Sequence, residues 1–219
     1  MKIFIDTADL VAIKKWLKTG ILDGVTTNPT HLSKAGGDPT AGVKEIAKLM
    51  GDRDVSVEVT ETDPERVYTQ AKAIVALAPN VVVKIPCALE YYSVIKRLVD
   101  EGVPLNITLV FSLMQGLAMC KLGVKYISPF IGRLDDINES GIGLVRDLRM
   151  MIDEYGYQTQ LLAASIREVM QLRESILVGA DVATVPVAVL EQATEHQLTR
   201  AGMKKFLVDW EQLKVKKFP

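Results

Sequence analysis

The sequence alternates eight times between a short run rich in β-branched and apolar residues and a longer segment of helical periodicity. This alternation predicts an α/β fold with parallel strands, because each helix returns the chain to the same end of the sheet. No Pro-, Gly- or Ser-rich linker divides the chain, so residues 1–219 are expected to form a single domain. The expected strands cover residues 2–6, 23–28, 55–60, 80–85, 104–109, 125–130, 160–165 and 180–185.

Local signals mark where some of the intervening helices begin. Asp63 followed by Pro64 is an N-cap residue with proline at the first helical position, and Ser112 and Gln115 have the spacing of a capping box. The last helix, near 202–214, would be an extra C-terminal element with a tail that reaches residue 219. Besides the helices that start near Asp63 and Ser112, the periodicity predicts helices over residues 8–18, 39–50, 88–101, 139–155, 167–178, 187–196 and 202–214.

Two folds fit eight strand–helix units, a closed (β/α)8 barrel (a TIM barrel) and an open doubly wound sheet. A dinucleotide-binding sheet carries a glycine-rich phosphate loop after its first strand. Here the first strand ends in Asp6-Thr7-Ala8, which favours the barrel. Because barrels of this type typically need about 250 residues, a chain of 219 leaves room for few insertions.

The composition argues against several partner classes. With a net charge of −1 and no apolar run near the length of a membrane span, we expect neither nucleic acid nor membrane as a partner. Asp6 interrupts the first apolar run, so export is not expected, and Cys87 and Cys120 are expected to be buried thiols in a reducing cytoplasm. His31 and His196 are far apart in sequence and are expected on the surface or in loops, so no metal or other cofactor is predicted.

A period-two pattern places polar residues on one face of successive strands. In the run 104–109, Leu105, Ile107 and Leu109 oppose Asn106 and Thr108. Both faces of a parallel barrel strand are normally apolar, so polar groups that recur near the carboxyl ends of the strands indicate a ligand pocket at that end of the barrel. The converging polar side chains are Asp6, Asn28, Glu58, Lys84, Asn106, Thr108, Ser128 and Ser165.

Lys84 is the most informative member of this set. It follows Val81-Val82-Val83 and precedes Ile85-Pro86, so it ends a strand that is apolar on both faces. Burial disfavours the ammonium form, and a neutral amine is what imine formation requires. Asp6 and Glu58 on other strands would supply a base and a second carboxyl group to manage water. The alternative is a lysine that extends from the barrel rim into solvent.

A basic group follows the sixth and seventh strands. Arg133 lies just beyond the sixth, and Ser165 and Arg167 close the seventh. Two guanidinium groups and a hydroxyl at the barrel mouth suit a phosphate, which arginine binds in a bidentate manner. The alternative is that these arginines only form salt bridges with Asp135, Asp136 or Glu168.

These motifs resemble the transaldolase family. The resemblance covers nearly the whole chain, in the right order, and the length is similar to the short microbial subfamily that also contains fructose-6-phosphate aldolases. His31 departs from the signature, which usually has an apolar residue there, and is expected to affect local packing; Cys87 is a second, smaller variation. The matching segments are Asp6-Thr7-Ala8, Gly24-Val25-Thr26-Thr27-Asn28-Pro29-Thr30, Lys84-Ile85-Pro86, Asn106-Ile107-Thr108, Ser128-Pro129-Phe130-Ile131-Gly132-Arg133 and Ala164-Ser165-Ile166-Arg167.

The resemblance implies one reaction and a role in it for each of these positions. Lys84 would attack the C2 carbonyl of fructose 6-phosphate or sedoheptulose 7-phosphate and form a Schiff base. Asp6 would take the C4 hydroxyl proton, and Glu58 with Thr108 would hold the water of imine formation. The resemblance also implies that the substrate is held by Thr26, Asn28, Asn106, Ser128, Phe130, Arg133, Ser165 and Arg167.

The resemblance further favours a transferase over an aldolase. Aldolases of the subfamily carry Gln at the position of Glu58 and Tyr at that of Phe130, whereas both residues here are of the transaldolase type. The family implies the pentose phosphate pathway and a homo-oligomer, a pentamer or decamer in which Phe206 and Trp210 of the C-terminal helix pack on a neighbour. Two alternatives stay open: a fructose-6-phosphate aldolase that releases free dihydroxyacetone, and a catalytically silent sugar-phosphate-binding barrel.

Overall fold

Eight parallel strands close into a barrel in sequence order, with β1 paired to both β2 and β8. The computed structural model describes residues 1–213. Each expected strand is present, with its ends within two residues of the expected ones, so the single-barrel prediction is confirmed and the open sheet is excluded. The strands are β1 (Lys2–Asp6), β2 (Gly24–Thr26), β3 (Asp54–Glu58), β4 (Val81–Pro86), β5 (Leu105–Val110), β6 (Tyr126–Pro129), β7 (Gln160–Ala163) and β8 (Val182–Val185).

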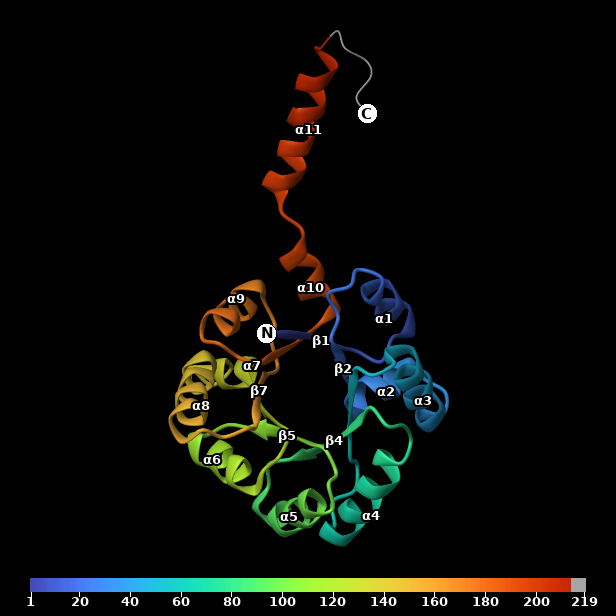
Figure 1. Cartoon of the computed structure of the whole chain (residues 1–219), viewed down its shortest axis with the longest axis vertical. Helices are drawn as coiled ribbons and strands as arrows, with labels where there is room; N and C mark the ends of the chain where they lie inside the picture. Colours follow the sequence, from blue (N-terminus) through green and yellow to red (C-terminus); the bar gives the residue numbers. More distant parts are fainter. Residues whose placement is uncertain (214–219) are drawn as a thin grey trace.

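The helices form a ring around the barrel, which Figure 1 shows end-on. A 3-10 turn (Leu89–Tyr91) precedes α5, and the described part of the chain contains no helix long and apolar enough to cross a membrane. The helices are α1 (Leu10–Leu17), α2 (Pro29–Ala35), α3 (Pro39–Met50), α4 (Pro64–Val75), α5 (Tyr92–Asp100), α6 (Leu113–Leu122), α7 (Ile131–Asp135), α8 (Gly141–Tyr155), α9 (Val169–Leu177), α10 (Val187–Thr194) and α11 (Gln197–Glu211).

Two short helices, α2 and α7, are absent from the expectations. Helix α2 has a clear start signal, because Asn28 accepts a hydrogen bond from the His31 N–H and Pro29 follows as the first helical residue. It buries no residue, so it has none of the apolar periodicity by which the other helices were predicted. Helix α7 has five residues, too few for a periodic pattern to appear.

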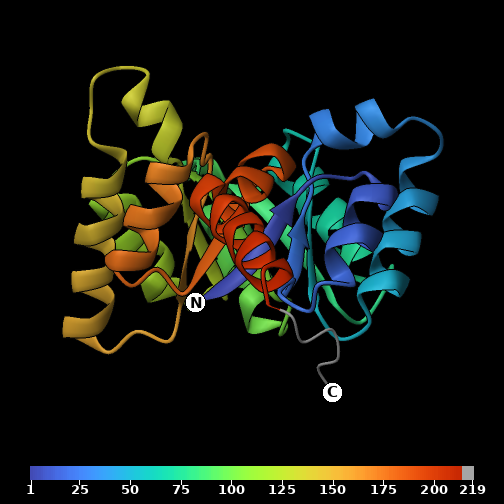
Figure 2. The same ribbon diagram turned by 90° about the horizontal axis from the view of Figure 1, so that it is seen from above.

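Helix α11 projects from the barrel in Figure 1, and in Figure 2, which is seen from above, it lies in front of the barrel. It begins at Gln197 rather than near residue 202, because the ring of His196 caps it by accepting from the Leu198 N–H at 3.2 Å. None of its residues is buried. The expected tail over residues 214–219 lies outside the described residues.

The barrel interior is divided into an apolar layer and a polar layer. Phe4 and Tyr126 meet edge to face in the apolar layer, with ring centroids 6.0 Å apart. Gly24 lies beside this layer, and a Cβ atom there would come within 2.4 Å of the Phe4 ring, so only glycine leaves room for the phenyl group. The apolar layer consists of Phe4, Val82, Tyr126, Leu162, Ala164 and Val182.

Candidate active site at the barrel mouth

The polar layer, which includes Asp6, Thr26, Glu58, Lys84 and Asn106, lies at the carboxyl ends of the strands. Strand register aligns it, because Glu58 pairs with Lys84 and Lys84 with Asn106, while Asp6 pairs with Thr26. Asp6 follows Phe4 by two positions and Lys84 follows Val82 by two positions, so each shares the inward face of its strand with a residue of the apolar layer. The polar side chains therefore point into the same end of the barrel. The alternation of the sequence and the pairing of the strands together build this layer.

Lys84 lies inside the barrel, with 6% of the residue exposed. Its Nζ is 2.8 Å from Oε2 of Glu58 on the adjacent strand and 3.5 Å from the carbonyl oxygen of Thr27. The side chain therefore does not extend into solvent as the alternative interpretation required. Glu58 lies where it can exchange a proton with the amine directly.

Asp6 is held through both oxygens of its carboxylate. The Thr26 hydroxyl donates to Oδ1 at 2.7 Å, and Nε2 of His31 lies 3.3 Å from Oδ2. Burial on its own raises the pKa of Asp6, but the hydrogen bonds from His31 and Thr26 and the nearby charge of Lys84 outweigh it, so the net pKa is lowered from its ordinary value. The carboxylate therefore remains ionised at neutral pH.

His31 is placed differently from the expectation. We expected it on the surface or in a loop, with an effect on packing rather than on chemistry. It instead lies on α2 with its ring on the Asp6 carboxylate, and 27% of its side chain is exposed. The expectation was wrong because α2 was not predicted, and only that helix turns this side chain back toward β1.

Asn106 and Ser128 form a hydrogen-bonded pair across β5 and β6. The Ser128 hydroxyl donates to Oδ1 of Asn106 at 2.6 Å, and Nδ2 of Asn106 donates to Oγ of Ser56 at 3.2 Å. All three residues are buried. This chain fixes the orientation of the Asn106 amide.

Thr108 is fully buried at the end of β5, and its hydroxyl has no hydrogen-bond partner among the described residues. A buried hydroxyl without a partner costs about 1–3 kcal/mol. The next residue, Leu109, has a φ of 58°, and the β5–β6 register shifts between Ile107 and Val110. Leu109 therefore lines a cavity instead of sharing a face with Leu105 and Ile107, which corrects the expected alternation.

Two cavities meet at Lys84. The mouth cavity, of about 250 Å³, lies over the barrel axis, and the outer cavity, of about 370 Å³, lies between α2 and the ends of β3–β5. The outer cavity is lined by Asn28, Pro29, Thr30, His31, Glu58, Lys84, Leu109, Phe130 and Arg133. The mouth cavity is lined by Asp6, Thr26, Asn28, Lys84, Asn106, Ser128, Phe130, Arg133, Leu162, Ala164, Ser165, Arg167 and Thr184.

The two arginines differ in their partners. Arg167 forms a two-point ion pair with Asp136, and half of its side chain is exposed. The salt bridge that the sequence predicted as the alternative to phosphate binding is therefore present at Arg167. Arg133 makes no ion pair within residues 1–213, and its guanidinium lies 5.7 Å from the centre of the Phe130 ring. Both line the mouth cavity together with Ser165.

The backbone beside this group is tightly constrained. Ser165 has a φ of 57°, and its carbonyl accepts from the Gly132 N–H at 3.0 Å. A Cβ atom at Gly132 would come within 2.6 Å of that carbonyl and 2.7 Å of Nε of Arg167. Glycine therefore allows α7 to approach the end of β7 and brings the two arginines to one side of the mouth.

Thr184 and Ser56 also belong to the polar layer and were not among the expected site residues. The Thr184 hydroxyl is 2.5 Å from that of Thr26, which extends the chain of hydroxyls that ends on Asp6. Thr184 follows Val182 by two positions on β8, so the period of two places both on the inward face, and this pattern in the sequence was enough to identify Thr184.

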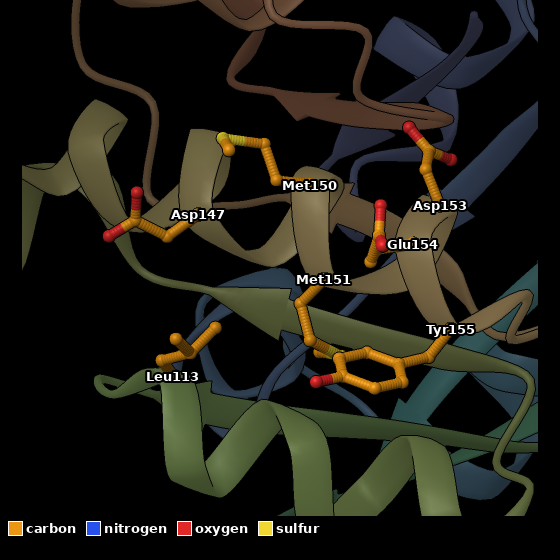
Figure 3. Close-up of a pocket in the computed structure, with 7 residues that line it drawn as sticks. All are labelled: Leu113, Asp147, Met150, Met151, Asp153, Glu154 and Tyr155. Carbon is orange, nitrogen blue, oxygen red and sulfur yellow. The ribbon is translucent and has the colours of Figure 1, made fainter.

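A larger hollow of about 740 Å³ lies on the outer surface between α6 and α8 (Figure 3). It contains carboxylates and apolar side chains but neither a buried amine nor an arginine, so its size does not make it the better candidate for chemistry. Within residues 1–213 no three His, Cys, Asp or Glu side chains gather as metal ligands. The hollow is lined by Leu113, Asp147, Met150, Met151, Asp153, Glu154 and Tyr155.

Comparison with known proteins gives one family. The family model described as "Transaldolase/Fructose-6-phosphate aldolase" matches residues 3–217. The chain is 47% identical to a probable transaldolase of Hydrogenobaculum sp. over the whole of both chains. It is 44% identical to one of Aquifex aeolicus, again over 100% of both chains, and 46% identical to one of Lactiplantibacillus plantarum over 96% of each. The family match and these identities over nearly the full length show that the chain, a closed barrel with a buried lysine beside the Glu58 carboxylate, belongs to the transaldolase/fructose-6-phosphate aldolase family.

Proposed function

We propose that the protein is a transaldolase that moves a dihydroxyacetone unit from fructose 6-phosphate or sedoheptulose 7-phosphate to an aldose phosphate. The observation that carries this proposal is the buried Lys84 amine, 2.8 Å from Glu58 and in the same cavity as Asp6. An amine beside two separate carboxylates suits an imine reaction, which needs a nucleophile and more than one proton transfer. The names of the relatives support the same reaction class.

The first half of the reaction takes place at Lys84. Glu58 takes one proton from the Lys84 ammonium group, and the neutral Nζ attacks C2 of the ketose to give a carbinolamine. A second proton then passes from the nitrogen to the C2 oxygen and Glu58 returns the first, so the oxygen leaves as water and the protonated imine remains. Thr108 lines neither cavity, but its buried hydroxyl has no partner among the described residues, so we propose that it accepts or donates a hydrogen bond to that water.

The second half takes place at Asp6. The ionised carboxylate takes the C4 hydroxyl proton, the C3–C4 bond breaks, and its electron pair moves to C3 and toward the imine nitrogen as an enamine. The aldose phosphate leaves and another enters. The enamine then attacks the new aldehyde carbon, and Asp6 returns its proton to the new hydroxyl. Water finally hydrolyses the new imine by the reverse of the steps at Lys84, which releases the product ketose phosphate and restores the amine.

The remaining lining residues suit the two ends of a sugar phosphate. The amides and hydroxyls of Asn28, Asn106 and Ser128 suit the hydroxyl groups of the dihydroxyacetone unit, and Thr26 acts through Asp6. Arg133, Ser165 and Arg167 suit the phosphate. Arg133 makes no ion pair in the described part of the chain and is available, whereas Arg167 must exchange Asp136 for the ligand.

Borohydride trapping tests the function. With fructose 6-phosphate, intact mass analysis should show a three-carbon addition on Lys84, and free dihydroxyacetone should stay near background until an acceptor aldose phosphate is added. Release that does not depend on the acceptor identifies the aldolase alternative. Sugar-phosphate binding without any adduct identifies the silent-barrel alternative.

Phe130 provides a test of transferase against aldolase. Its ring lines both cavities and has no proton to donate, which supports a long-lived enamine. We expect Phe130→Tyr to raise acceptor-independent release of dihydroxyacetone about tenfold, because a phenol can help water to protonate the enamine carbon. Phe111→Tyr is the matched control. The rings of Phe111 and Phe130 meet edge to face with their centroids 6.0 Å apart, but Phe111 lines neither cavity. Equal release from both variants would contradict this role for Phe130.

We further propose a homo-oligomer, a pentamer or decamer, in which α11 packs on a neighbour. Helix α11 buries none of its residues and exposes Phe206 (71%) and Leu207 (63%). Phe206→Glu should lower the sedimentation coefficient to that of a smaller species. Met170 is an exposed apolar residue on α9, and Met170→Glu should leave the sedimentation coefficient unchanged. If Phe206→Glu also left it unchanged, this contact would be contradicted.

The proposed location is the cytoplasm and the proposed pathway is the pentose phosphate pathway. The two cysteines, Cys87 and Cys120, are both free and buried, which supports a reducing compartment. The pathway follows from the sugar phosphates of the proposed reaction.

A further inference from the structure

His31 joins the candidate site through a contact that the proposed chemistry has not used. Its Nε2 lies 3.3 Å from Oδ2 of Asp6, while the Thr26 hydroxyl holds Oδ1 at 2.7 Å. An ionised carboxylate only accepts hydrogen bonds, so the Nε2 atom must be the donor. Two donors on different oxygens, from α2 and β2, fix the rotation of the carboxylate about its last bond.

We propose that His31 is a positioning residue for Asp6 in the step that breaks and remakes the C3–C4 bond. This inference rests on the transaldolase reaction proposed above. His31 does not exchange the C4 hydroxyl proton. Together with Thr26 it holds the carboxylate in one orientation, so that a remaining lone pair on one of its oxygens faces the C4 hydroxyl.

The position of the imidazole is itself well defined. The His31 N–H donates to Oδ1 of Asn28 at 2.9 Å, and this cap starts α2 with Pro29 as the first helical residue. The cap determines which way the first turn of α2 faces. A residue at position 31 is therefore directed at Asp6 by the backbone, and its side chain decides whether a donor reaches the carboxylate.

Charged groups surround His31 on several elements. It lines the outer cavity together with Glu58, Lys84 and Arg133, and it also lines an adjoining hollow of about 500 Å³ with Lys34 of its own helix and Asp9 beyond β1. The imidazole thus separates the reacting amine from the open surface over α2. Lys34 is the charged residue on the same helix as His31, so a variant at that position serves as the control for general effects of charge.

The hydrogen bond also affects the strength of Asp6 as a base. Burial raises the pKa of Asp6, and the hydrogen bond from His31 is the largest of the interactions that lower it. Removing the donor should raise that pKa. The acid limb of kcat should then move to higher pH, because the group must lose its proton before it can accept one from the substrate.

The test compares His31→Leu, which removes the donor, with His31→Gln, whose Nε2 can reach the same place. Lys34→Gln on the same helix is the control for charge and for changes in α2. Each protein is assayed for kcat against pH and treated with borohydride after mixing with fructose 6-phosphate. The mass on Lys84 distinguishes a six-carbon phosphorylated adduct, trapped before bond cleavage, from a three-carbon adduct trapped after it.

We expect His31→Leu to lower kcat about tenfold, to shift the acid limb to higher pH and to enrich the six-carbon adduct. His31→Gln should restore most of kcat, and Lys34→Gln should resemble the wild type. An unchanged adduct ratio and acid limb in His31→Leu would overturn the proposal, as would equal losses in the Leu and Gln variants. Failure of the transaldolase proposal looks different, because the wild type itself would then give no adduct on Lys84.

Discussion

Lys84→Met should abolish both the borohydride adduct and the transfer reaction, with a loss of about four orders of magnitude or more in kcat. Met has a similar length and fills the same buried position, but it has no nitrogen to form the imine. The reaction then has no means of delocalising the electron pair left at C3. The measurements are intact mass after trapping and the rate of acceptor-dependent transfer.

The Lys84 ion pair makes a folding control necessary. Lys84→Met leaves the Glu58 carboxylate without its partner in a mostly buried site, and breaking a buried pair in this way can cost about 3–5 kcal/mol. The double variant Lys84→Met, Glu58→Gln removes the unpaired charge. It should regain most of the thermal stability and still form no adduct. An adduct in either variant would show that another amine is the nucleophile.

Asp6→Asn should lower kcat by about 10²–10⁴-fold while leaving imine formation intact. The amide has nearly the same shape as the carboxylate but cannot accept the C4 hydroxyl proton. The trapped species on Lys84 should therefore be the six-carbon adduct, with little of the three-carbon one. Wild-type amounts of the three-carbon adduct would show that another group takes the proton.

The same residue predicts a pH effect on stability. Because the pKa of Asp6 is lower in the folded chain than its ordinary value, its contacts stabilise the fold above the ordinary pKa. That contribution is lost as the pH falls through the lower, folded pKa. Asp6→Asn should therefore show a smaller loss of thermal stability than the wild type between neutral and strongly acidic pH, in thermal melts measured side by side.

Much of the architecture is present in local sequence patterns. The alternation of strand-like and helix-like segments predicted eight parallel strands, and the period of two predicted that Glu58, Lys84 and Asn106 share the inward face. Both depend on regularities within a few residues, which survive in any tertiary arrangement that keeps the strands. Barrel closure was favoured only because the first strand lacks a phosphate loop.

The contacts between distant segments depended on the tertiary structure. His31 reaches Asp6, Arg167 pairs with Asp136, and Thr184 meets Thr26 across the closing strands β8, β1 and β2. Each pair is separated by many residues and is brought together by barrel closure or by a helix with no apolar period. Residue type and spacing along the chain say which groups can accept or donate a proton. Only the closed barrel determines which of them face each other, because strand order and helix direction set the distances between their side chains.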